Sequence, residues 1–327
     1  MLTYKRNLPT MVTPTAYSRL PGTPEPMHYW PGDGVRIAGD SWGPPGGPLV
    51  LLQHGGGQTR HAWKEAGQAL GAAGFHAVAF DARGHGDSDW DAQGRYGQDM
   101  MVRDLQCVVD ALGRRRPMLV GASMGGGTSL VAAGEGHVNA TAVVLVDVAP
   151  HIEAQGVANI QAFMNQRPEG FDSLEDVAAA IASYQPHRQR PRKLDGLAKN
   201  VRLGPDGRYH WHWDPRFLDK TRDLAQRTSR LEACARNLTV PALLVRGGLS
   251  DVLTEEGAQN FLALCPQAEY VVVGSAAHMV AGDRNDVFAN AVVKFLKRAA
   301  DTGAHDALGP RVPRPGGALD TDAVDIP

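Results

Sequence analysis

Short apolar runs alternate with amphipathic stretches along most of the chain. The apolar runs are rich in valine, leucine and alanine and have the length of strands: 48–53, 76–80, 117–122, 141–148, 241–247 and 268–274. The stretches between them have helical patterning, at 60–73, 97–112, 125–135, 255–264 and 285–299. Strands that read as continuous apolar runs are buried on both faces. The alternation therefore predicts an α/β fold, with a mostly parallel central sheet flanked by helices.

Residues 151–235 interrupt this alternation, because they carry helix signals but no strong strand run. Asp214 followed by Pro215, for example, is typical of a helix start. We therefore expect a mainly helical cap, called the lid below, inserted between the sixth and seventh strands. The α/β core would then consist of residues 28–150 and 236–300.

The two ends of the chain differ from the rest in composition. Residues 1–27 and 301–327 are rich in proline, glycine and threonine and poor in large apolar side chains. Such segments cannot bury enough apolar surface to fold alone, so we expect extended or disordered tails. The N-terminal segment also lacks the apolar run of a signal peptide, which favours a cytoplasmic protein.

One serine lies in a glycine-rich turn where a strand should pass into a helix. Ser123 stands in Gly-Ala-Ser-Met-Gly, between Gly121 and Gly125. The pattern G-x-S-x-G at such a turn is typical of a nucleophile elbow. A phosphate-binding loop would need a lysine, and none occurs between Lys64 and Lys193; a dinucleotide fingerprint is also absent. Close helix packing alone would be the other reason for these glycines.

Two further features supply what a nucleophilic serine needs. The sequence His-Gly-Gly-Gly-Gln follows an earlier strand, and the N–H of Gly56 in this turn, together with that of Met124, is our candidate oxyanion hole. His278 follows the last strand and is the candidate general base, because imidazole can accept the serine proton and return it to a leaving group.

The carboxylate that would orient His278 has two candidates. Asp251 follows the penultimate strand and gives the chain order Ser, Asp, His. Asp147 fits the same order one strand earlier. We favour Asp251, because its Gly-Gly-Leu-Ser-Asp turn projects the carboxylate on a loop, whereas Asp147 lies within an apolar run.

These motifs, together with "FDARGHGDS" after the second apolar run, resemble the α/β-hydrolase superfamily, and its capped bacterial serine esterases and lactonases in particular. The resemblance covers residues 28–299. It implies the fold, a Ser/Asp/His triad and no metal or other cofactor. Serine at the elbow, where epoxide hydrolases and dehalogenases of this fold carry aspartate, implies an acyl-enzyme.

Several activities remain open within that resemblance. A carboxylic-ester hydrolase is the leading interpretation. The alternatives are a lactonase that also accepts acyl-lactones, a thioesterase, a C–C hydrolase, a cofactor-free perhydrolase, or a non-catalytic receptor for a small ligand.

The lid contains a segment in which aromatic residues alternate with His210 and His212. In an extended conformation the aromatic side chains would share one face, which could cap an apolar substrate or pack the lid on the core. The two histidines have no third ligand beside them that would suggest a metal. The candidate substrate contacts are Gly57, Tyr209, Trp211, Trp213 and Met279.

Charge and hydropathy limit the partners we expect. The formal net charge is only −2, which gives no electrostatic footprint for nucleic acid or an anionic membrane. No apolar stretch reaches 18 residues. We expect a small-molecule ester or lactone as substrate, no nucleic-acid or membrane partner, and a monomer or homodimer.

Overall fold

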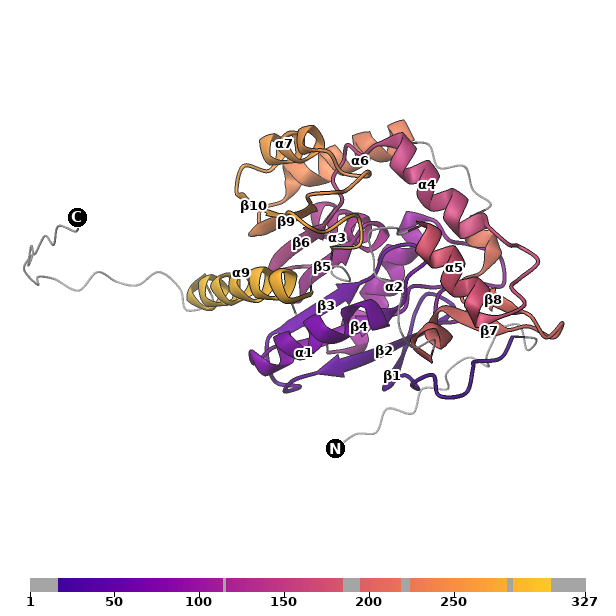
Figure 1. The fold of residues 1–327 in the computed structure, drawn as a ribbon. Helices are drawn as coiled ribbons and strands as arrows, with labels where there is room; N and C mark the ends of the chain where they lie inside the picture. The colour runs from indigo at the N-terminus through magenta and orange to yellow at the C-terminus, as the bar shows by residue number, and fades with distance from the viewer. Residues whose placement is uncertain (1–16, 114–115, 185–194, 219–223, 281–284, 307–327) are drawn as a thin grey trace, which may run out of the picture.

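A computed structural model describes residues 17–113, 116–184, 195–218, 224–280 and 285–306 (Figure 1). Its main sheet has eight strands in the order β1-β2-β4-β3-β5-β6-β9-β10. All neighbours from β4 to β10 pair in parallel, whereas β1 and β2 join the edge in antiparallel fashion. The strands are β1 (His28–Pro31), β2 (Arg36–Trp42), β3 (Leu49–Gln53), β4 (His76–Phe80), β5 (Met118–Ala122), β6 (Ala142–Val146), β9 (Ala242–Gly247) and β10 (Ala268–Val273).

The six apolar runs of the sequence correspond to the six parallel strands, so the prediction of a mostly parallel sheet is confirmed. The antiparallel hairpin of β1 and β2 was not predicted. The apolar pattern of β2 is interrupted by Gly39 and by Asp40, although the strand itself is continuous. Asp40 is a nearly buried carboxylate that accepts a hydrogen bond from Arg60. A strand with polar residues that are paired through tertiary contacts does not read as an apolar run.

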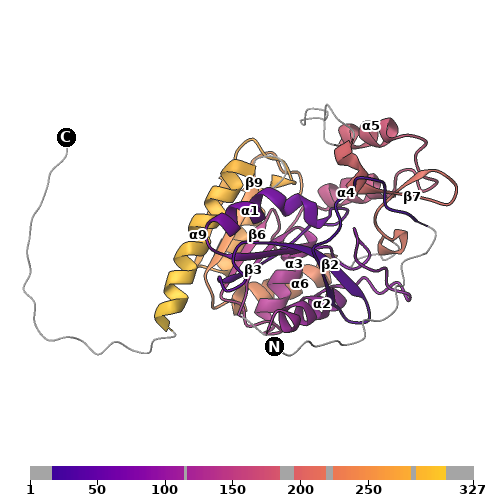
Figure 2. The same cartoon turned by 90° about the horizontal axis from the view of Figure 1, so that it is seen from below.

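Helices cover both faces of the sheet (Figures 1 and 2). On one face lie α1 (Lys64–Ala72) and α9 (Asn285–Asp306), which pack against each other. On the other lie α2 (Gln98–Ala111), α3 (Met124–Gly134), α6 (Leu224–Asn237) and α7 (Glu255–Leu264). Because α9 continues to Asp306, the C-terminal tail does not begin at residue 301 as predicted.

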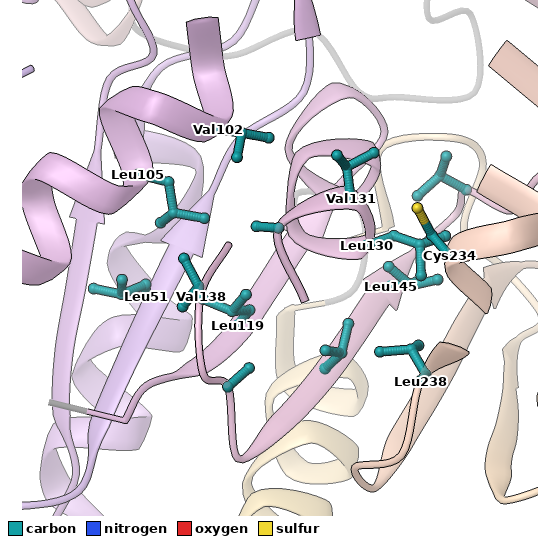
Figure 3. Packing of buried hydrophobic residues seen from close by; sticks show 14 of the residues in the cluster. Leu51, Val102, Leu105, Leu119, Leu130, Val131, Val138, Leu145, Cys234 and Leu238 are labelled. Atoms are coloured by element: carbon teal, nitrogen blue, oxygen red, sulfur yellow. The ribbon is translucent and has the colours of Figure 1, made fainter. Parts of the chain in front are cut away.

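Apolar side chains from the sheet and the second helix layer form the larger core, part of which Figure 3 shows. Strand residues such as Leu119 and Leu145 contact helix residues such as Leu130 of α3 and Cys234 of α6, all at most 1% exposed. Burial on this scale stabilises each side chain by about 1.5 to 3 kcal/mol. This packing holds the β5–α3 junction, where Ser123 lies, against the centre of the sheet.

The segment between β6 and β9 forms the lid, inserted between the sixth and seventh strands of the sheet as predicted. In both views α4 (Ala154–Asn165), α5 (Leu174–Tyr184) and β7 (Val201–Leu203) lie together at one end of the sheet (Figures 1 and 2). β7 pairs with β8 (Tyr209–Trp211) in a small antiparallel sheet that we did not expect. The lid also contains the short 3-10 helices η2 (Asp195–Asn200) and η3 (Pro215–Phe217), and η1 (Arg60–Trp63) precedes α1 in the core.

The end of the lid differs from the prediction as well. α6 begins at Leu224 within the expected lid, yet it packs against α3 and contributes Leu231 and Cys234 to the core. At the N-terminus, Ser18 exchanges two backbone hydrogen bonds of 2.8 Å with Leu203 of the lid. Residues 1–16 and 307–327, which make up most of the two predicted tails, lie outside the described residues. Among the helices that are described, none is long and apolar enough to cross a membrane.

Candidate active site

Ser123 occupies a strained turn between β5 and α3. Its φ is 47° and its ψ is −109°, a conformation that non-glycine residues rarely adopt. The turn is tight because a Cβ added at Gly121 would lie 2.3 Å from the carbonyl oxygen of Gly125, so no side chain fits there. The Ser123 N–H donates to the carbonyl of Val146 at 3.1 Å, which ties the turn to the end of β6. The half-buried side chain is therefore held beyond the carboxyl end of the sheet.

Asp147 follows β6 and contacts His278, which follows β10. Its backbone has φ 51°, so the chain turns sharply as the strand ends and carries the carboxylate across the end of β9. Oδ2 of Asp147 lies 2.7 Å from Nδ1 of His278. The carboxylate is fully buried and the imidazole is 12% exposed. Since a carboxylate can only accept here, we assign the proton to Nδ1, which leaves Nε2 of His278 as the unprotonated nitrogen.

Three donors converge on the Asp147 carboxylate. Gly247 N–H donates to Oδ1 at 2.8 Å, and Ser250 Oγ donates to Oδ2 at 2.5 Å, in addition to His278. Ser250 Oγ itself accepts from the N–H groups of Val252 and Leu253, at 3.1 and 3.2 Å, so its proton is directed to Asp147. A buried carboxylate with three donors is fixed in position.

The prediction that Asp251 contacts His278 is wrong. The Asp251 side chain is exposed, and its carboxylate accepts a hydrogen bond from Asn159 of α4 at 3.0 Å. Its backbone is packed against the same helix, where a Cβ added at Gly156 would lie 2.3 Å from the Asp251 carbonyl oxygen. The turn after β9 therefore directs Asp251 to the lid, and the neighbouring Ser250 faces the site instead. Asp147, the second candidate, takes the place beside His278.

The glycine turn after β3 lies directly against the serine. A Cβ added at Gly55 would be 3.3 Å from Cβ of Ser123. Gly55 N–H donates to Oε1 of Gln58, and Gly57 N–H donates to Nε2 of His85. Among the described residues no acceptor is found for the N–H of Gly56.

The second candidate oxyanion donor is at the start of α3. Met124 is the first residue of this helix, and its N–H likewise has no acceptor within the described part of the chain. The first N–H groups of a helix carry partial positive charge. The N–H groups of Gly56 and Met124, the two predicted donors, are thus both without an acceptor in the described part of the chain.

The aromatic residues of the lid mainly pack with one another. Trp211 and Trp213 are 8% and 3% exposed, and their rings are stacked with centroids 4.9 Å apart. Trp211 also contacts Phe163 and Phe171 of the lid. Tyr209 is half-buried and exchanges backbone hydrogen bonds with Phe171. Packing within the lid and against the core therefore accounts for the contacts of these residues.

Other apolar side chains lie closer to the glycine turn. A Cβ added at Gly56 would lie 3.7 Å from Phe217 and 3.8 Å from Met164, and one added at Gly57 would lie 3.2 Å from Met164. Met164 comes from α4 and Phe217 from η3. The sequence did not indicate that Met164 and Phe217 lie beside the glycine turn, because a single apolar residue on a lid helix has no distinguishing pattern. Met279, predicted as a substrate contact, is half-buried directly after His278.

A buried ion-pair network supports the loop that follows β4. Arg60, with its side chain fully buried, contacts Asp81 at 2.6 Å, Asp87 at 2.8 Å and Asp40 at 3.0 Å. Burial alone would raise the pKa of Asp81, but the Arg60 guanidinium, together with other contributions that include hydrogen bonds from the N–H groups of Arg60 and Asp87, lowers that pKa to about 2. The loop carries His85, which contacts the glycine turn, so the network fixes the scaffold of the site.

No cluster of three or more His, Cys, Asp or Glu side chains with the geometry of a metal site occurs in the described residues. His210 and His212 have different surroundings. His210 contacts Asp206 of the lid at 3.0 Å, whereas His212 is buried against the core.

Comparison with known proteins relates this geometry to a family. A family model described as the alpha/beta hydrolase fold matches residues 48–284. An esterase of Mycobacterium tuberculosis is 28% identical over 261 residues, which cover 78% of this chain and 83% of that protein. A 2-(acetamidomethylene)succinate hydrolase of Mesorhizobium japonicum is 27% identical, covering 76% of this chain and 88% of the relative. The crystal structure of an E-2-(acetamidomethylene)succinate hydrolase superposes with a TM-score of 0.72 at 24% identity, covering 83% of this chain and all of that one.

Proposed function

The chain belongs to the α/β-hydrolase family and is a hydrolase, and on that premise we propose that it cleaves carboxylic esters through an acyl-enzyme on Ser123. The observation that carries this proposal is the buried pair of Asp147 and His278, at 2.7 Å, beyond the same end of the sheet as the strained serine turn. A buried carboxylate bonded to imidazole orients the ring and stabilises the positive charge that the ring gains during catalysis.

In the proposed reaction, Ser123 Oγ attacks the ester carbonyl carbon while Nε2 of His278 takes the hydroxyl proton. The carbonyl oxygen becomes an oxyanion, which accepts hydrogen bonds from Gly56 N–H and Met124 N–H. Asp147 stabilises the imidazolium and keeps the ring in one orientation. The C–O bond to the alcohol then breaks, and His278 gives its proton to the departing alkoxide.

Water completes the cycle in the second half of the reaction. His278 removes a proton from water, the resulting hydroxide attacks the acyl-serine, and the acid is released as the proton returns to Ser123 Oγ. A lactone follows the same steps, except that its alcohol and acid remain in one product molecule. The balance requires no oxidant, reductant or metal ion.

The surroundings of the glycine turn support a small, largely apolar substrate. Phe217 and Met164 lie within 4 Å of the position of a side chain at Gly56, and Met124 contributes a third apolar side chain. Apolar contacts of this kind favour acyl or aryl groups without charge.

The proposal is tested with a substrate panel. We expect hydrolysis of p-nitrophenyl acetate and butyrate that is lost in Ser123→Ala, with γ-butyrolactone and an acyl thioester as comparison substrates. Equal hydrolysis by wild type and Ser123→Ala would refute the mechanism. Tight binding of an ester without turnover would favour the receptor instead.

A further inference from the structure

The lid contributes a residue to the turn that carries Gly56. Three peptide groups of this turn are each held by one histidine. The Gly55 carbonyl accepts from Nδ1 of His54 at 2.8 Å, and the Gly57 N–H donates to Nε2 of His85 at 3.2 Å. The Gly57 carbonyl lies 3.3 Å from Nε2 of His212, which follows β8 in the lid.

The hydrogen bonds of these rings assign one neutral form to each. His54 Nε2 accepts from Ala82 N–H at 2.9 Å, and His212 Nδ1 accepts from Gly86 N–H at 2.9 Å. The opposite nitrogen of each ring must then carry the proton and donate to a glycine carbonyl. Desolvation by burial lowers the pKa of both His54 and His212, which keeps the rings neutral.

The side chain of His212 is held from the lid side as well. The residue is 1% exposed, and its backbone N–H donates to the carbonyl of Asn200 at 3.2 Å. Arg202 of β7 donates to the Gly86 carbonyl at 2.6 Å, so Gly86 is bonded to two lid residues, through its N–H to His212 and through its carbonyl to Arg202. The lid hairpin is thus bonded to the core loop and, through one imidazole, to the glycine turn.

We propose that His212 is a positioning residue for the oxyanion hole, by which the lid fixes the orientation of the glycine turn and of the free Gly56 N–H. This inference rests on the proposed role of Gly56 as an oxyanion donor. Preorganised donors act on the transition state more than on the bound substrate. Loss of the His212 bond should therefore lower kcat and leave KM nearly unchanged.

The chain allows matched variants. In His212→Asn the amide can accept from Gly86 but is too short to reach Gly57, whereas in His212→Gln the amide nitrogen can donate to the Gly57 carbonyl. His210→Asn, two residues away in the same hairpin, is the control, because His210 bonds to Asp206 within the lid. Removing an oxyanion donor outright costs about 10² to 10³ in kcat, so displacing one should cost less.

The experiment measures p-nitrophenyl butyrate hydrolysis, inhibition by phenylboronic acid, and hydrogen exchange of the peptide 53–59. We expect His212→Asn to lower kcat about 10- to 100-fold, with KM changed less than threefold and the boronate inhibition constant raised in parallel. His212→Gln should recover much of the loss, and His210→Asn should match wild type. A kcat for His212→Asn within twofold of wild type, or a loss confined to KM, would overturn the inference.

Hydrogen exchange tests whether His212 holds the glycine turn, and this test does not depend on enzymatic activity. We expect faster exchange in residues 53–59 of His212→Asn than in His210→Asn, and equal exchange would overturn the inference. If wild type hydrolyses no ester and Ser123 is unreactive, the proposed function fails, but this comparison still shows whether His212 holds the turn.

Discussion

The substitution Asp147→Asn tests the identity of the acid that orients His278. An asparagine amide would fill the same buried space, but its NH2 group would face Ser250 Oγ and His278 Nδ1, which both donate to the carboxylate. The imidazole would then turn to the tautomer in which Nδ1 accepts and Nε2 carries the proton. In that form Nε2 cannot take the proton of Ser123.

The expected loss can be estimated from this change of tautomer. The same substitution in serine proteases lowers kcat about 10⁴-fold, which corresponds to about 5 kcal/mol of activation free energy. Asp251→Asn is the matched control. The exposed Asp251 carboxylate bonds to Asn159, and surface substitutions usually change free energies by less than about 0.5 kcal/mol. We therefore expect a change in kcat of no more than about threefold.

The assay is p-nitrophenyl butyrate hydrolysis by both variants at pH 8, with circular dichroism to verify that each is folded. Asp147→Asn should lose about three to four orders of magnitude in kcat, and Asp251→Asn should remain close to wild type. A folded Asp147→Asn with nearly full activity, or a much larger loss in Asp251→Asn, would refute the assignment.

Three further predictions concern the support of the site. Ser250→Ala removes a donor to Asp147 and should lower kcat/KM about tenfold in the same assay, because hydrogen bonds to charged groups contribute about 1.5 to 3 kcal/mol. The pKa of Asp81 is lowered from 3.8 to about 2 in the folded protein, so its stabilisation is complete above pH 4 and is lost as the pH falls towards 2. Thermal unfolding of Asp81→Asn should therefore depend less on pH across this window than that of wild type. Tyr96→Phe removes the buried hydroxyl that donates to Asp214 and should lower the free energy of unfolding by about 1 to 2 kcal/mol in urea titrations.

Much of the fold was predictable, because strands buried on both faces must be continuously apolar. The runs that became β3 to β6, β9 and β10 show this pattern, and the helices between them begin and end within a few residues of their predicted limits, except that α9 ends at Asp306 and not at residue 299. The exceptions are the β1–β2 hairpin at the sheet edge and the β7–β8 hairpin in the lid. Short strands, and strands whose polar residues find distant partners, lack a local signal.

Only the site residues that belong to a local sequence motif were predictable. Ser123, His278 and the glycine turn are marked by residue type and position after a strand. The acid was not, since Asp147 reads as the end of an apolar run until its φ of 51° and the approach of Gly247 are known. The contact of His212 with the glycine turn joins residues 155 positions apart, and no sequence spacing indicates it.

The most direct measurement of the central claim is covalent labelling of Ser123. Wild-type protein is treated with a fluorophosphonate and digested, and the modified peptide is identified by mass spectrometry. We predict one adduct per chain on Ser123, none in Ser123→Ala, and slower labelling in Asp147→Asn than in Asp251→Asn. Folded wild-type protein that hydrolyses esters without acquiring label at Ser123, or that is labelled at another residue, would contradict the account.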